Sequence, residues 1–161
     1  MQLFEAYIEK KAVEKAEKLF SSAAERGLEA MGLLVGKVFS WEGRQYVVVD
    51  DFITARNRAS SVSVKFSEDA FGELVEKTTK QHHKIFVGWA HSHPGYGCFL
   101  SKTDVQTQHK YFPAPFHVAL VIDPLKPNGS GFVKMFYKTD ESGYREASFA
   151  IVERENNGRT I

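Results

Sequence analysis

Residues 85–111 read Ile85-Phe-Val-Gly-Trp-Ala-His91-Ser-His93-Pro94-Gly-Tyr-Gly-Cys-Phe-Leu-Ser101-Lys-Thr-Asp104-Val-Gln-Thr-Gln-His-Lys-Tyr111. An apolar, β-rich run leads into two histidines, and the residues from Thr103 onward predict a helix. In an extended strand, residues i and i+2 point to the same side of the backbone. His91 and His93 can therefore direct both imidazoles at one point.

The turn after the histidines can bring a carboxylate to the same place. Pro94 cannot donate to a sheet ladder, so regular strand pairing should stop there. Gly95 and Gly97 allow a sharp return of the chain. That return can set Asp104, in the first turn of the next helix, opposite the histidines. Two neutral nitrogens and one carboxylate oxygen form a ligand set that zinc accepts, with a fourth position for water. The pattern predicts a catalytic metal site.

Each part of the pattern also has a purely structural interpretation. His91 and His93 could form a polar strand edge or a hydrogen-bonded pair of side chains. Ser101-x-x-Asp104 is close to a capping box that starts the helix, a role that still leaves the serine hydroxyl facing the site. Cys98 could be proposed as a nucleophile because histidines lie nearby, but no separate orienting His/Asn arrangement is visible.

Taken together, the motifs resemble those of the JAMM (MPN+) metalloproteases. One motif is His91-Ser-His93-Pro94, a seven-residue span that ends on the serine, and then Ser101-Lys-Thr-Asp104. The other is the upstream run Glu29-Ala-Met-Gly-Leu-Leu-Val-Gly. Two separated motifs in the expected order are more specific than either one alone. The resemblance extends over roughly residues 3–137, nearly the whole chain.

This resemblance implies a fold and a division of roles. The implied fold is an α/β sandwich of the JAMM/MPN (cytidine deaminase-like) type, in which helices flank a curved, mixed or antiparallel sheet. One Zn²⁺ per chain would be held by His91, His93 and Asp104. Glu29 would accept a proton from the attacking water and return it to the leaving amine. Ser101 would donate a hydrogen bond to the oxyanion. From its position alone Glu29 would be a surface carboxylate, so its role depends on the resemblance.

The implied substrate is an isopeptide bond between a lysine and the Gly-Gly C-terminus of ubiquitin or a ubiquitin-like protein. The proteasome is the implied partner complex. In the family, an insertion near residues 54–63 helps to hold the extended substrate tail, which an unpaired segment could do through backbone hydrogen bonds. The alternative is a simple polar loop. The residues assigned to this groove are Ser61, Val62, Ser63, Val64 and Phe66.

Two other functions remain open. A processing peptidase would use the same chemistry to mature a sulfur-carrier or other ubiquitin-like precursor with the same tail. A non-catalytic MPN scaffold would only bind partners. Such scaffolds typically lack part of the ligand set, whereas this sequence retains all five expected groups.

The composition predicts a globular protein and excludes some classes of function. A chain of 161 residues with 43% hydrophobic and 25% charged residues predicts one globular domain. We assign residues 1–152 to a single catalytic domain and 153–161 to a polar tail. A net charge of +1 offers no broad basic field for nucleic acid or a membrane surface. The single cysteine and the lack of a signal or spanning segment predict a cytoplasmic protein.

Periodicity and turn signals outline the remaining elements. The expected strands cover residues 3–8, 28–39, 45–54, 116–123, 132–137 and 144–152, besides the run that begins at Ile85. The expected helices cover residues 9–26, 67–80 and 103–111, and residues 123–131 are expected to form a loop. Gly32 and Gly36 mark close approaches to the backbone. The expected positions of the other histidines are structural for His117, solvent-facing for His82 and His83, and outside the site for His109.

Overall fold

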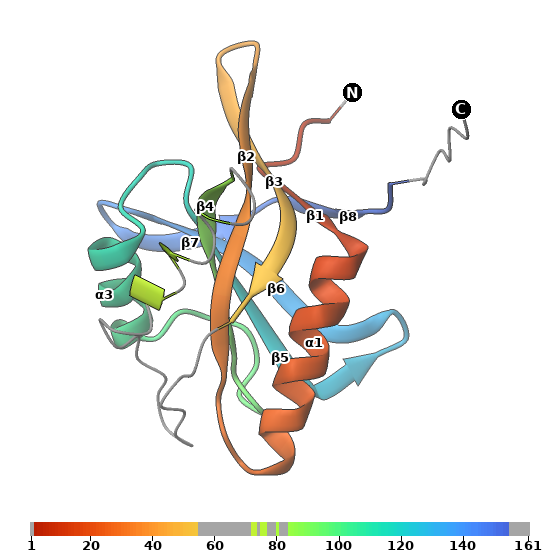
Figure 1. The fold of residues 1–161 in the computed structure, drawn as a ribbon. Helices are drawn as coiled ribbons and strands as arrows, with labels where there is room; N and C mark the ends of the chain where they lie inside the picture. Colours follow the sequence, from red (N-terminus) through yellow and green to blue (C-terminus); the bar gives the residue numbers. More distant parts are fainter. Residues whose placement is uncertain (1, 55–71, 74, 77–79, 81–83, 155–161) are drawn as a thin grey trace, which may run out of the picture.

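The computed structural model describes residues 2–54, 72–73, 75–76, 80 and 84–154 (Figure 1). The elements in chain order are β1 (Ala6–Glu9), α1 (Lys10–Glu25), β2 (Met31–Trp41), β3 (Arg44–Ile53), β4 (Ile85–Ser92), α3 (Lys102–Tyr111), β5 (Val118–Asn128), β6 (Gly131–Asp140), β7 (Gly143–Ala147) and β8 (Phe149–Val152). The expected helix over 67–80 lies largely outside the described residues. The segment 61–66, His82 and His83 lie entirely outside them.

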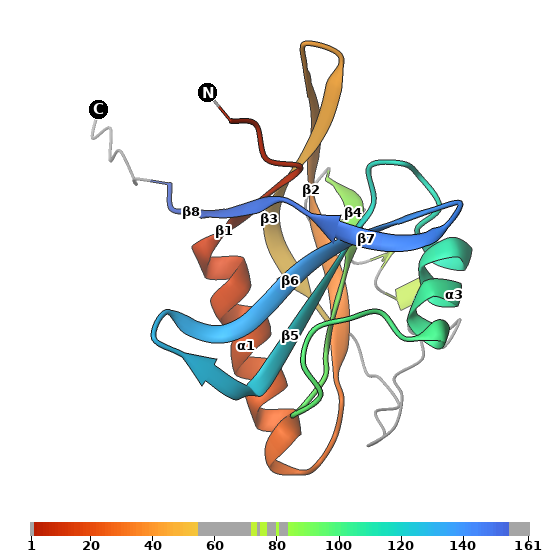
Figure 2. The ribbon, with the colours of Figure 1, turned by 180° about the vertical axis from the view of Figure 1, so that it is seen from behind.

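The eight described strands form one mixed sheet in the order β7-β6-β5-β4-β2-β3-β1-β8. Strand β4 lies in its middle, antiparallel to β2 and parallel to β5. The sheet curls until it is nearly barrel-shaped, with α1 on one side and α3 on the other (Figures 1 and 2). This confirms the predicted α/β architecture of a curved, mixed sheet flanked by helices.

Helix α1 forms where apolar residues recur at helical spacing. Its buried residues are Ala12, Val13, Ala16, Phe20 and Ala23. The Phe20 ring meets Phe52 of β3 edge to face, with ring centroids 5.6 Å apart. Gly27 follows at a φ of +67°, which ends the helix where the sequence predicts. No helix in the described part of the chain is long and apolar enough to cross a membrane.

The central strands are buried on both faces, which explains their nearly continuous apolar sequence. Along β4, Ala90 belongs to the core cluster that packs with α1, whereas Trp89 belongs to a second cluster with residues of α3. A Cβ atom on Gly32 or Gly36 would collide with backbone atoms of β3. The predicted close approaches at these two glycines are therefore confirmed.

The predicted loop over 123–131 is wrong. Strand β5 continues to Asn128 and turns through Gly129 and Ser130 into β6. The Asn128 Oδ1 atom accepts a hydrogen bond of 2.9 Å from the Ser130 backbone N–H and closes this turn. The β5–β6 ladder is irregular between Asp123 and Pro127, and such a break accommodates proline within a strand.

The single strand predicted over 144–152 is two strands. β7 pairs with β6 at one edge of the sheet, and β8 pairs with β1 at the other edge. Between them, the Ser148 carbonyl accepts hydrogen bonds of 3.0 Å from the backbone N–H groups of Glu5 and Ala6. The curl of the sheet thus lets one residue carry the chain from one edge to the other. The first strand, expected over 3–8, begins only at Ala6.

Candidate metal centre

His91 and His93 lie at the carboxyl end of β4. His91 is fixed between Met31 of β2 and Val121 of β5, its partners in the two neighbouring strands. The backbone N–H of His93 donates to the Ile122 carbonyl at 3.0 Å and continues the pairing with β5. The Nε2 atoms of the two histidines are 3.1 Å apart. The structure therefore brings both imidazoles to one point, as their spacing predicts.

Asp104 reaches the histidines from the first turn of α3. Ser101 is the N-cap of this helix: its hydroxyl accepts from the Asp104 N–H at 3.1 Å. In return, the Ser101 N–H donates to Asp104 Oδ2 at 2.8 Å, which completes a capping box. The same Oδ2 atom lies 3.1 Å from His91 Nε2 and 3.3 Å from His93 Nε2. The capping role of the motif therefore coexists with its place beside the histidines.

The spacing of these three atoms fits a tetrahedral metal ion. Zinc bonds of about 2.05 Å to nitrogen and oxygen place neighbouring ligands about 3.3 Å apart. The observed separations of 3.1, 3.1 and 3.3 Å match that value. His91, His93 and Asp104 are 1%, 4% and 6% exposed. They are the one group in the described part of the chain whose side chains could hold a metal ion.

The electrostatics of the cluster also favour a cation. Burial lowers the pKa of His91, which favours the neutral imidazole that metals bind. Burial opposes the ionisation of Asp104, but its contacts with His91 and His93 outweigh burial and hold the pKa of this carboxyl well below its usual range. His93 Nδ1 lies 3.3 Å from the Gly97 carbonyl, which can only accept a hydrogen bond. A proton on Nδ1 can donate to this carbonyl, and that tautomer leaves the Nε2 lone pair for a metal ion.

Glu29 lies just before β2, beside His93. The Ser92 N–H donates to the Ala30 carbonyl at 3.0 Å, and the Ala30 N–H donates to Ser92 Oγ at 2.9 Å. These bonds place Ala30 opposite Ser92, one residue beyond the last β2–β4 pair. The next pair along the two strands is Glu29 and His93. The Glu29 side chain is buried, and burial is the main cause that raises its pKa. The charge of Asp104 raises this pKa further, while His93 opposes the shift. A carboxyl with a raised pKa is suited to carry protons near neutral pH.

A second layer of side chains supports the cluster. The Trp89 indole stacks on the His91 imidazole, with ring centroids 4.3 Å apart and an interplanar angle of 8°. Trp89 Nε1 donates to Oε1 of the buried Gln108 at 2.5 Å. Gln108 lies one turn after Asp104, so this bond fastens α3 to β4 and fixes the position of the carboxylate. Gln108 was not predicted from the sequence, although its i+4 spacing from Asp104 indicates a side chain on the same face of the helix.

Three other candidates lie outside the cluster. Burial raises the pKa of the Cys98 thiol, which disfavours the thiolate that a nucleophile needs. The Nδ1 atom of His117 accepts from the Ala114 N–H at 3.0 Å, and burial lowers the pKa of this imidazole. His117 therefore has the structural position that we expected. His109 is exposed on α3.

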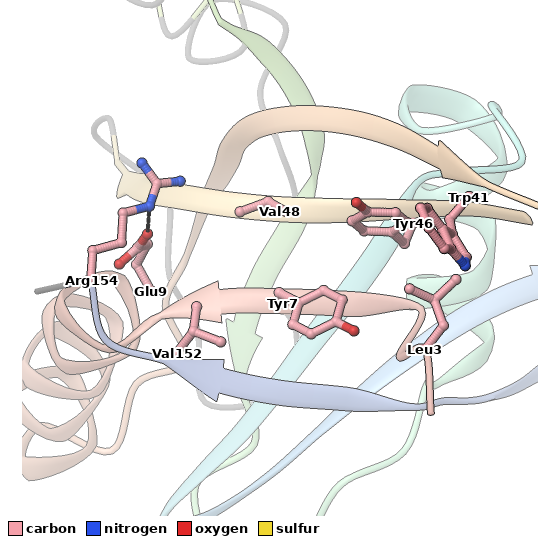
Figure 3. A pocket seen from close by; sticks show the side chains of 8 residues that line it. All are labelled: Leu3, Tyr7, Glu9, Trp41, Tyr46, Val48, Val152 and Arg154. Carbon is pink, nitrogen blue, oxygen red and sulfur yellow. Dashed lines mark ion pairs between the residues drawn. The ribbon is translucent and has the colours of Figure 1, made fainter. Parts of the chain in front are cut away.

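An apolar groove lies on another part of the sheet, over β1, β3 and β8 (Figure 3). Its volume is about 350 Å³. Its lining residues are Leu3, Tyr7, Glu9, Trp41, Tyr46, Val48, Val152 and Arg154. The ion pair between Glu9 and Arg154 closes one end. No residue of the metal cluster lines this groove, so it is separate from the candidate metal centre.

Comparisons with known proteins agree with this site. Residues 2–113 match the family model described as JAB1/Mov34/MPN/PAD-1 ubiquitin protease. COP9 signalosome complex subunit 5 of Oryza sativa subsp. japonica is 41% identical over 133 residues, which cover 78% of this chain and 36% of that protein. The 26S proteasome non-ATPase regulatory subunit 14 of Dictyostelium discoideum is 37% identical over 103 residues, which cover 62% of this chain and 32% of that protein. The chain thus spans about a third of the length of these curated relatives.

A solved structure supports the fold separately. The solution structure of a protein from Desulfitobacterium hafniense superposes with a TM-score of 0.69, covering 92% of this chain and 94% of that one. At 23% sequence identity, this similarity concerns the fold alone. The family model, in contrast, covers well over half of the sequence and includes every residue of the metal cluster. The chain therefore belongs to the JAB/MPN family, which includes the JAMM (MPN+) proteins that its motifs resemble.

Proposed function

We propose that the chain is a zinc-dependent isopeptidase that removes ubiquitin or a ubiquitin-like protein from lysine conjugates. The observation that carries this proposal is the convergence of His91, His93 and Asp104 at metal-ligand spacing. The catalytic domain would comprise residues 1–152, followed by a polar tail over 153–161. The protein would act in the cytoplasm, where its single cysteine stays reduced.

Each proposed role follows from the position of a side chain. His91, His93 and Asp104 would hold one Zn²⁺, which when bound lowers the pKa of a water ligand to about 7 and polarises a carbonyl. Glu29 would accept the proton of the attacking water and deliver it to the leaving lysine amine. The Ser101 hydroxyl already accepts from the Asp104 N–H, so its own hydrogen is left to donate to the substrate oxygen as negative charge develops there.

The surroundings of the site suit a thin, extended substrate tail. The aromatic rings of Phe99 and Tyr96 lie 4.6 and 6.4 Å from the His93 ring, between centroids, and both side chains are exposed. A Gly-Gly tail has no side chains to exclude, so it can lie extended between such rings and reach a buried centre. The segment with Ser61, Val62, Ser63, Val64 and Phe66 is the proposed second contact for this tail.

The relatives suggest where such an enzyme would work. Their names describe subunits of the COP9 signalosome and the 26S proteasome. We therefore propose a multi-subunit assembly such as the proteasome as a partner, besides the ubiquitin-like substrate. Neither a nucleic acid nor a membrane is proposed, because the net charge of +1 gives no broad basic field.

Metal analysis combined with a cleavage assay tests the proposal. The purified protein should contain about one equivalent of zinc and cleave lysine-linked ubiquitin-like conjugates. A chelator should abolish the cleavage, and added zinc should restore it. Cleavage only of precursors extended beyond Gly-Gly would replace the isopeptidase with a processing peptidase. Bound zinc without cleavage of either substrate would favour a scaffold and overturn the proposed activity.

A further inference from the structure

Asp123 on β5 is a fully buried carboxylate, with 0% of the residue exposed. No lysine or arginine of the described residues forms an ion pair with it. Its oxygens instead accept from three backbone N–H groups. Oδ1 accepts from Gly95 at 2.9 Å and from Leu125 at 3.0 Å, and Oδ2 accepts from Gly97 at 2.7 Å. An isolated charge is costly to bury. The three N–H donors offset that cost for the Asp123 carboxylate, and such a built arrangement indicates a specific role.

Two of these donors belong to the turn that follows the histidines. Gly95 and Gly97 both have positive φ angles, +83° and +80°. Residues that alternate in this way can point their N–H groups into one concavity, a nest that binds anions. Here the anion comes from the protein itself. The carboxylate of Asp123 therefore determines the course of the turn over residues 94–97.

The same turn also contacts the imidazole of His93, one of the three residues of the metal cluster. The Gly97 N–H donates to Asp123, and the Gly97 carbonyl faces His93 Nδ1 at 3.3 Å. His93 and Asp123 are also neighbours across the parallel β4–β5 pair, because the His93 N–H donates to the Ile122 carbonyl. Two contacts, joined through the backbone of Gly97, thus connect Asp123 to His93. The Nε2 atom of His93 is the one that faces Asp104.

We propose that Asp123 is a positioning residue that holds His93, through the backbone of Gly97, in the tautomer and direction that metal binding needs. The inference rests on the proposed metal site and adds to it. A partner that orients a ligating histidine through its second nitrogen typically changes metal affinity by 10–100-fold when it is removed. A carboxylate that only stabilised the end of β5 would change the stability of the fold and leave metal affinity alone.

The direct test compares two buried aspartates. Asp123→Asn keeps the shape of the side chain but turns one acceptor oxygen into an NH₂ group that faces N–H donors. Zinc affinity, measured by competition with a chelating dye, should fall 10–100-fold. Asp50→Asn is the matched control. Asp50 is 5% exposed and forms ion pairs with the exposed Arg154 and with Lys84, so the zinc affinity of Asp50→Asn should stay at the wild-type value.

Two readouts need neither metal nor turnover. In the metal-free wild-type protein, nitrogen NMR of the His93 ring should show a larger share of the tautomer with the proton on Nδ1 than in Asp123→Asn. In Asp123→Asn the two tautomers should mix, and the Gly95 and Gly97 amides should exchange faster with solvent. These measurements keep the inference separate from the proposed activity, because a wild-type protein that cleaves nothing would leave them unaffected.

A second pair of variants decides the matter if Asp123→Asn does not fold. Gly97→Ala and Gly43→Ala both introduce a Cβ at a positive φ, +80° and +76°, and in neither position would the new atom meet another within 4 Å. The backbone strain is therefore comparable, but Gly43 lies in the β2–β3 hairpin. Zinc affinity should fall in Gly97→Ala and stay unchanged in Gly43→Ala. Wild-type zinc affinity in Asp123→Asn, or in Gly97→Ala where Asp123→Asn does not fold, would overturn the inference.

Discussion

Buried carboxylates occur in two regions of this molecule, and their partners differ. Where β1 and β3 lie side by side, Glu9 and Asp50 are both nearly buried. Arg154 contacts both carboxylates, and Lys84 reaches Asp50 at 3.3 Å. Asp104 is equally buried, but its side-chain partners are the imidazoles of His91 and His93. In the first region the cations are supplied by the chain. In the second region no lysine or arginine of the described residues contacts Asp104, and its side-chain partners are two imidazoles.

This difference distinguishes a structural charge cluster from the candidate metal centre. A buried carboxylate is stable only when a positive charge or several hydrogen bonds compensate it. At Asp50 that compensation is complete within the protein. At Asp104, burial lowers the pKa of His91 and favours its neutral form, so a bound cation would add the positive charge that no neighbouring lysine or arginine among the described residues provides. The following predictions test this contrast.

The largest effect is expected for Asp104→Asn, which removes one ligand and the only negative charge among the three. Zinc at a thousand times its dissociation constant should stabilise the wild-type protein by ~4 kcal/mol, which raises the melting temperature by roughly 10 °C. The variant should show no zinc-dependent shift and no turnover. Asp50→Asn should retain the full shift. A zinc-dependent shift of wild-type size in Asp104→Asn would show that the metal binds elsewhere.

Glu29→Gln should have the next largest effect, and on turnover alone. An amide of the same shape cannot accept the water proton, so turnover should fall by about 10²–10⁴-fold while the zinc content stays at one equivalent. Glu9→Gln is the matched control, because Glu9 is 4% exposed and Glu29 is 5% exposed. Steady-state cleavage rates and metal analysis of both variants check the prediction. Wild-type turnover in Glu29→Gln would refute its role as the base.

The smallest effect concerns a charge pair at the surface. Arg145 donates to both carboxylate oxygens of Glu5, and these contacts lower the pKa of Glu5. A lowered carboxyl pKa contributes stability that is present above the unfolded pKa and is lost as the pH falls through the folded pKa. Arg145→Gln should therefore lower the free energy of unfolding by about 0.2–1 kcal/mol at pH 7. This difference between variant and wild type should vanish in acid, below the pKa of Glu5 in the folded protein. Urea unfolding of both proteins across this pH range measures it, and a difference that grows in acid would contradict the assignment.

Local sequence patterns predict the candidate metal ligands but not the residues that support them. His91 and His93 are related by strand geometry, and Asp104 is related to Ser101 by a capping box, so all three candidate ligand positions follow from short spacings. Glu29 was proposed only through the family resemblance, because its place beside His93 depends on the register of β2 against β4. Asp123 was missed for a similar reason. Its contacts with the turn over 94–97 exist only once β5 has paired in parallel with β4.

The two strand corrections have the same physical origin. Ser148 carries no glycine or proline signal, so a local pattern cannot show that the chain changes edges there. That change requires the curl of the whole sheet. The prolines near Asp123 indicate a loop by local rules, but the irregular β5–β6 ladder absorbs them.

The position of β1 has a consequence for synthesis of the chain. This strand lies between β3 and β8, and it pairs with β8 in the register Ala6 with Phe149. Such distant pairings form slowly because a long loop must close first. During translation, one side of β1 therefore has no partner until β8 leaves the ribosome, and an open β edge invites association with other chains. We expect nascent chains that stall before Phe149 to depend on chaperones, whereas finished chains have this edge covered.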